Sequence, residues 1–216
     1  MEEYVLLQSQ LGIMAYCNLY PDSTYYNLPF IVELSSDIDL ERLSEAWKKL
    51  FLLRPVFRTR FRINDDGRFL QFVDDEMDIP VKIRQCSHEE LMDYVENDFV
   101  RPFDLLGSEP LTRVELVNTE KGPYLLWDIH HIISDYTVIN KVILQEDLSQ
   151  LYETMTLPEE EYTLYDAVND EQESFLTEEY KSSLTASYSV YSSSGRVIVS
   201  YNCERSSCRI TLFITV

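Results

Sequence analysis

Short strand-like runs joined by hairpin turns alternate with amphipathic helical stretches along most of the chain. The run Leu40–Leu53 repeats apolar residues at helical spacing and ends at Pro55. The next run, Val56–Ile63, alternates bulky and basic side chains, and Asp65-Asp66-Gly67 predicts a hairpin turn into the strand Arg68–Val73. Hairpins impose antiparallel pairing, while the amphipathic helices need a sheet face to cover. The sequence therefore predicts an α+β or a mixed α/β fold.

The same signals predict the remaining elements. We expect further strands at Phe30–Leu34, Val81–Arg84, Leu111–Val117, Tyr124–Ile129, Arg196–Tyr201 and Arg209–Val216. We expect further helices at Leu6–Leu19, from Ser87 to about Val100, at Thr137–Tyr152 and at Leu164–Leu184. In the first of these helices the predicted stripe comprises Leu7, Leu11 and Met14, with Asn18 as its next position.

Acidic side chains outnumber basic ones by more than two to one. The chain has 38 Asp and Glu against 18 Lys and Arg, a formal net charge of −20. Such a surface repels phosphate backbones and anionic lipid heads, so nucleic acids and membrane surfaces are poor partners. Residues 187–216 differ, because they hold three arginines and one glutamate, whereas 15 of the basic and 37 of the acidic side chains lie within 1–186. We therefore predict a boundary between 186 and 187.

Cysteine usage and hydropathy predict a cytoplasmic protein. The four cysteines, Cys17, Cys86, Cys203 and Cys208, form no CxxC pair. That scatter argues against a disulfide framework or structural zinc and for reduced thiols. No apolar run approaches the ~18 residues of a membrane span. The first residues also lack the basic start and apolar stretch of a secretory signal.

Two of the three histidines are adjacent, His130 and His131, and Asp135 follows them. They end an apolar predicted strand, in which neighbouring side chains point to opposite faces. One histidine can then be buried while the other faces a cleft and acts as a general base. A histidine pair on an apolar strand is, however, more often structural than catalytic. Zinc binding is a weaker alternative, because adjacent strand histidines diverge, and Ser134 lacks the GxSxG setting of a nucleophile.

The segment His130–Asp135 resembles the HHxxxDG active-site motif of the condensation domains of nonribosomal peptide synthetases. That motif is shared with the chloramphenicol acetyltransferase-like superfamily. The following segments also resemble the family, in the family's order: Leu6–Tyr16 with Gln10 inside it, Tyr20–Phe30, Leu40–Leu53, Phe57–Phe61, Arg101–Leu105 and Pro110–Val114. The resemblance extends over about Val5–Leu184. It implies a two-layer α+β sandwich that is one half of a pseudo-dimer, with the active site in the tunnel between the halves.

The chain departs from the family pattern in three places. Tyr136 replaces the glycine that closes the motif, and Leu53, followed by Arg54, replaces an arginine that often begins the second motif. The motifs of the C-terminal half are missing. The resemblance thus implies an N-terminal half at residues 1–186, followed by a divergent tail of unknown origin at 187–216.

The implied reaction is amide bond formation between an acceptor amine and an aminoacyl or peptidyl thioester. Both substrates are carried on phosphopantetheine arms of partner carrier proteins, so the resemblance implies no directly bound cofactor and no metal. His131 would face the tunnel as the catalytic residue beside His130. Asp135 would pair with Arg58 behind the site and hold the loop.

Because the resemblance covers only one half of a condensation domain, two other functions are also considered. A stand-alone trimeric CoA-dependent acyltransferase would complete its site across a subunit interface, although the histidine motif of those enzymes lies near the C-terminus and 85 residues follow His131 here. A non-catalytic remnant or docking module is the third hypothesis. As part of a condensation domain, the chain would need the missing C-terminal half or an oligomer partner, and alone we expect it to be inactive.

Overall fold

The computed structural model describes residues 2–134, 138–157, 166–170, 197–202 and 209–214. Two sheets form its frame. The larger has six strands, in the order β5 (Val81–Gln85), β6 (Thr112–Thr119), β7 (Gly122–His130), β2 (Asn27–Glu33), β9 (Arg209–Ile214) and β8 (Val197–Asn202). Among the described strands of this sheet, only β5 and β6 pair in parallel, and the other neighbours are antiparallel. The smaller sheet is antiparallel, in the order β1 (Glu3–Val5), β4 (Phe69–Val73) and β3 (Thr59–Ile63).

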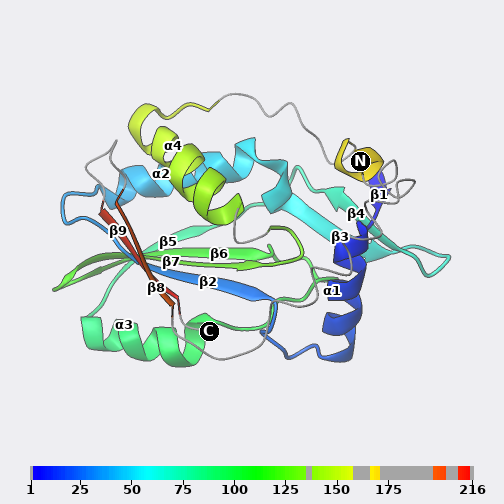
Figure 1. The fold of residues 1–216 in the computed structure, drawn as a ribbon, viewed down its shortest axis with the longest axis horizontal. Helices are drawn as coiled ribbons and strands as arrows, with labels where there is room; N and C mark the ends of the chain where they lie inside the picture. Colours follow the sequence, from blue (N-terminus) through cyan, green and yellow to red (C-terminus); the bar gives the residue numbers. More distant parts are fainter. Residues whose placement is uncertain (1, 135–137, 158–165, 171–196, 203–208, 215–216) are drawn as a thin grey trace.

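Helices cover both faces of the larger sheet (Figure 1). The labelled α-helices of the described residues are α1 (Gln8–Leu19), α2 (Leu40–Leu53), α3 (His88–Tyr94) and α4 (Ser149–Thr154), and residues 166–170 are also α-helical. Two π-helical segments, Val95–Phe99 and Val138–Leu148, continue α3 and precede α4. Figure 1 shows α2 and α4 on one face of the sheet, α3 on the other, and α1 beside the smaller sheet. The predicted α+β class is confirmed.

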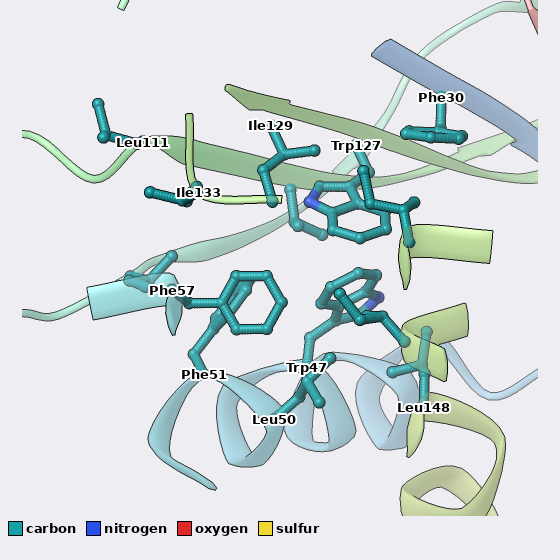
Figure 2. Close-up of a cluster of buried hydrophobic side chains, with 14 of the residues drawn as sticks. Phe30, Trp47, Leu50, Phe51, Phe57, Leu111, Trp127, Ile129, Ile133 and Leu148 are labelled. Carbon is teal, nitrogen blue, oxygen red and sulfur yellow. The ribbon is translucent and has the colours of Figure 1, made fainter. Parts of the chain in front are cut away.

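The main core lies between α2 and the larger sheet (Figure 2). Trp47 of α2 and Trp127 of β7 are fully buried, and their ring centroids are 4.9 Å apart. Phe30 of β2 stacks on Trp127 from the neighbouring strand, at 5.4 Å. The indole Nε1–H of Trp127 donates to Thr112 Oγ1 at 2.8 Å, which satisfies its polar atom inside the core. Burying these rings fixes α2 against the sheet.

A smaller cluster lies on the opposite face of the sheet, under α3. It comprises Ile31, Leu91, Phe99, Val117, Tyr124 and Leu126. Because Ile31 points into this cluster while Phe30 and Val32 point into the main core, β2 is buried on both faces. Such burial is typical of a central strand rather than an edge strand.

Two local predictions are wrong. The strand expected at Val56–Ile63 begins only at Thr59, because Pro55–Arg58 forms a 3₁₀ turn. Proline has a fixed φ suited to the first position of a helical turn, so it starts this turn instead of merely ending α2. In α1, Leu11 is exposed and the buried side chains are Gln10 and Met14. The predicted stripe is therefore rotated, since the helix buries a polar residue that has hydrogen-bond partners.

The other predicted elements match within a few residues where they are described. The expected capping box is present, as Ser87 Oγ accepts from Glu90 N and the Glu90 carboxylate accepts from Ser87 N. Most of Leu164–Leu184 and the start of Thr137–Tyr152 lie outside the described residues. Within the described ranges, no helix combines the length and apolar character needed to cross a membrane.

Strands from the tail, residues 187–216, belong to the larger sheet. β9 pairs with β2 through Ile31–Glu33, and β8 pairs with β9. The hairpin thus lies along the edge of β2 that faces away from β7. The boundary between 186 and 187 remains a prediction from composition. In the structure, strands from both sides of this position belong to one sheet.

Removing residues 187–216 should make the chain self-associate. The truncation exposes the outer edge of β2, a strand buried on both faces, and open apolar edges pair with other chains. We expect light scattering after size-exclusion chromatography to give the truncated chain a higher average mass than the full chain at equal concentration. Equal masses would show that the hairpin does not protect this edge.

Candidate active site

The histidine pair lies where β7 ends. His130 is the last residue of β7, and its backbone N–H donates to Leu111 O at 2.9 Å. The N–H of His131 donates to Tyr26 O at 2.8 Å, just before β2. His130 is 2% exposed and His131 is half-buried. Strand alternation therefore separates the pair as expected, into one buried ring and one that solvent reaches.

Hydrogen bonds give the two rings opposite tautomers. His131 Nδ1 lies 2.8 Å from Ser134 O, and because a carbonyl only accepts, Nδ1 carries the hydrogen. The lone pair of His131 is then on Nε2, as a general base requires. His130 Nδ1 instead accepts from Ile132 N–H at 3.2 Å, which places the hydrogen of that neutral ring on Nε2.

Helix α1 holds the loop that follows the histidines. Gln10, 7% exposed, donates from Nε2 to Ile132 O at 3.1 Å and to Gln71 Oε1 at 3.0 Å. Its Oε1 accepts from Leu7 N–H at 2.8 Å. Gln10 thereby connects α1, β4 and the histidine loop. The sequence placed Gln10 within a motif segment of the family. Apolar periodicity, in contrast, did not predict that Gln10 lies on the buried face of the helix.

A buried ion pair lies on the same face of β7 as His130. Asp128 is fully buried and accepts from Asn27 Nδ2 at 2.7 Å and from Arg113 Nη1 at 3.0 Å. Arg113 lies over the Phe103 ring, 3.7 Å from its centroid, and Phe103 packs edge-on against His130. This network was not predicted, since it joins residues from four distant parts of the sequence.

Burial outweighs the ion pair in setting the ionisation of these groups. It raises the pKa of Asp128 to about 6, although Arg113 and the Asn27 hydrogen bond act in the opposite direction. It lowers the pKa of Arg113 to about 10, against the opposing effect of Asp128. Burial, with smaller contributions from the charges of His131 and Arg113, lowers the pKa of His130 to about 4. His130 is therefore neutral at neutral pH.

Arg58 lies in the 3₁₀ turn and is 8% exposed. Its Nη1 pairs with Asp75 at 2.5 Å, and its Nη2 donates to Leu52 O at 3.3 Å. Its buried Nε has no hydrogen-bond partner among the described residues. Asp135, the predicted partner of Arg58, and Tyr136 both lie outside the described residues, so that pair remains a prediction.

A second arginine joins α2 to the segment beyond the site. Arg54 forms a bidentate ion pair with Asp147, with Nε–Oδ2 and Nη2–Oδ1 distances of 2.6 and 2.8 Å. Asp147 lies in the π-helical segment Val138–Leu148, so the pair links α2 to the chain that follows the histidine loop. The sequence showed Arg54 only as the neighbour of a motif position held by Leu53. Among the described residues, no cluster of side chains has the make-up of a metal site.

Comparisons with known proteins agree with this fold and identify a family. The model of the condensation domain family matches residues 1–185. The chain is 31% identical to bacitracin synthase 3 of Bacillus licheniformis over 158 residues, which cover 73% of this chain and 2% of the synthase. It is 34% identical to gramicidin S synthase 2 of Aneurinibacillus migulanus over 157 residues, which cover 72% of this chain and 3% of that synthase.

Solved structures share the fold. The starter condensation domain of rhizomide synthetase RzmA has a TM-score of 0.71 and 17% identity, covering 93% of this chain and 52% of that one. The first condensation domain of the CDA synthetase has a TM-score of 0.70 and 17% identity, and the match covers 93% of this chain and 52% of that one. The fold is thus the α+β fold of the chloramphenicol acetyltransferase-like class. More narrowly, the chain belongs to the condensation domain family of nonribosomal peptide synthetases, and it spans about half the length of these solved domains.

Replacing Gln10 with alanine should destabilise the protein. The change leaves Ile132 O and Gln71 Oε1 buried without the hydrogen bond that each accepts. We expect the free energy of unfolding to fall by about 1–3 kcal/mol in urea titrations. The matched control is Asn18→Ala, which alters an exposed side chain of the same helix and should change that free energy by less than ~0.5 kcal/mol. Equal effects of the two variants would contradict the assigned contacts.

Asp128 and His130 should have opposing effects on stability between pH 4 and 6. The folded pKa of His130 lies below its ordinary value of 6.5, so the stability this ring contributes is complete above pH 6.5 and is lost as the pH falls toward 4. The folded pKa of Asp128 lies above its ordinary value of 3.8, so its contribution is complete below pH 3.8 and is lost as the pH rises through 6.

Asp128→Asn should therefore steepen the loss of stability on acidification. We expect the slope of unfolding free energy against pH, measured by urea unfolding from pH 4 to 6, to increase by up to about 1.4 kcal/mol per pH unit. Asp65→Asn, in the exposed hairpin turn, is the control that should leave the slope unchanged. A slope unaltered by Asp128→Asn would show that this carboxyl is not protonated in the folded protein near pH 5.

Proposed function

We propose that the chain is the N-terminal half of a condensation domain that forms amide bonds within a nonribosomal peptide synthetase. The substrates are an acyl, aminoacyl or peptidyl thioester and an acceptor amine. Both are presented on phosphopantetheine arms by carrier proteins, which are the partners of this half. The setting is the cytoplasm. The observation that carries the proposal is the 2.8 Å contact of His131 Nδ1 with Ser134 O, because it leaves Nε2 as the basic atom of a half-buried ring.

The acceptor amine attacks the thioester carbonyl, and a C–N bond forms while the C–S bond breaks. The amine loses a proton in this step, and the departing thiolate gains one. His131 Nε2 accepts the amine proton, or stabilises the charge of the tetrahedral intermediate, and the same proton can pass to sulfur. His130 is too buried to touch the substrate, and its role is to hold the loop.

Asp135 completes this arrangement by pairing with Arg58. Two observations support the pairing. Arg58 Nε is buried and lacks a hydrogen-bond partner among the described residues. In Figure 2, Phe57, the neighbour of Arg58, lies opposite Ile133 of the histidine loop, and both residues belong to the main core. The described part of the motif loop and the turn that carries Arg58 thus contribute side chains to the same core.

A second half must complete the site. The solved condensation domains are about twice as long as the part that this chain matches. Positioning two reactants supplies ~7–11 kcal/mol of a reaction barrier. General-base catalysis by His131 contributes only about 10²–10⁴-fold and cannot replace positioning. The other half, or an oligomer partner, therefore supplies the opposite wall.

The isolated chain should show no condensation with carrier-bound substrates, with or without His131. The assay uses the purified chain alone, and also the chain co-purified with the C-terminal half of a related condensation domain. In the co-purified complex we expect turnover that His131→Ala lowers by about 10²-fold or more. His88→Ala, which changes a histidine on α3, is the matched control and should retain turnover.

Other outcomes would overturn parts of this proposal. Turnover by the monomer that disappears in His131→Ala would contradict the requirement for a second half. A trimer that acylates a small amine from acetyl-CoA would favour the stand-alone acyltransferase. An assembled complex that binds loaded carriers but forms no amide would favour a non-catalytic remnant.

A further inference from the structure

A thiol lies against the buried histidine of the pair. Cys17 Sγ is 3.6 Å from His130 Nε2, within hydrogen-bond range for sulfur. Cys17 lies on α1 seven residues after Gln10, which places both on the same face of the helix, toward the histidine loop. Helix α1 therefore contacts this loop twice, once through Gln10 at Ile132 O and once through Cys17 at the His130 ring.

The direction of this second contact follows from the other side of the ring. His130 Nδ1 accepts from Ile132 N–H, so in the neutral ring Nε2 carries the hydrogen and points it toward Cys17 Sγ. Burial raises the pKa of the Cys17 thiol, so the sulfur is an uncharged acceptor at neutral pH. The rings of Phe103 and Tyr26 also face His130, with centroids 5.9 and 6.3 Å from its ring centroid.

We propose that Cys17 is a positioning residue for the histidine site. Its sulfur holds His130 in the Nε2–H tautomer, so that Nδ1 stays available to Ile132 N–H and the loop keeps Ser134 O against His131. The contribution to catalysis rests on the proposed function, whereas the tautomer and the loop geometry do not. Cys17 acts through His130 and touches no reacting atom.

Imidazole ¹⁵N chemical shifts and amide hydrogen exchange test this role in the full chain. In the unaltered protein at pH 7 we expect the Nε2–H tautomer for His130 and the Nδ1–H tautomer for His131, with His88 as the third resonance. Cys17→Val keeps most of the side-chain volume but removes the acceptor. It should introduce the Nδ1–H tautomer at His130 and speed exchange of the Ile132 amide by about tenfold, as expected for the loss of one hydrogen bond.

Cys17→Ser separates hydrogen bonding from packing, because its hydroxyl can still accept from Nε2–H. We expect this variant to restore the Nε2–H tautomer and slow Ile132 exchange relative to Cys17→Val. Cys86→Val, which changes the other described cysteine, should alter neither signal. An unchanged His130 tautomer in Cys17→Val, or identical spectra of the Val and Ser variants, would overturn the proposal. These measurements need no condensation activity. Failure of the Cys17 proposal can therefore be distinguished from failure of the proposed function.

Discussion

Strand β7 is buried on both faces along nearly its whole length. The hydrophobic clusters on the two faces of the larger sheet, and the histidine site at the end of the strand, all include its side chains. Its alternate residues serve two different environments. Trp127 faces the aromatic core under α2, while Asp128 and His130 point to the opposite face. An ionisable group without water must have built-in partners or become neutral. Asp128 accepts hydrogen bonds from Arg113 and Asn27. His130 accepts one from the Ile132 N–H, and its Nε2 lies against the Cys17 sulfur.

Local signals in the sequence predicted most of the elements, and long-range contacts account for what they missed. The bounds of α2 and the position of the β3–β4 turn follow from apolar spacing, caps and turn residues that act within a few positions. The buried face of α1 could not be predicted in this way. Gln10 is buried because Ile132, 122 residues further along, offers a carbonyl. Asp147 likewise becomes a partner of Arg54 only after the chain has folded back onto α2.

The site shows the same division. Alternation along a strand was enough to predict one buried and one accessible histidine. The tautomers were not predictable, because each depends on a backbone group two or three residues ahead in a particular loop shape. Composition also indicated that residues 187–216 differ from the rest of the chain. It carried no information on strand pairing, and the sheet uses β9 to cover β2.

Adjacent imidazoles pose an electrostatic problem that burial solves. If His130 were protonated beside His131, the two like charges would oppose each other, and a base that gains a positive charge would be weakened. Burial together with the charge of Arg113 keeps the pKa of His130 near 4, so the buried ring stays neutral. The loop then has one fixed ring and one ring that can take a proton. Under the proposed function, His131 would hold the proton removed from the acceptor amine, while His130, placed between Ile132 N–H and Cys17 Sγ, would preserve the loop geometry during the transfer.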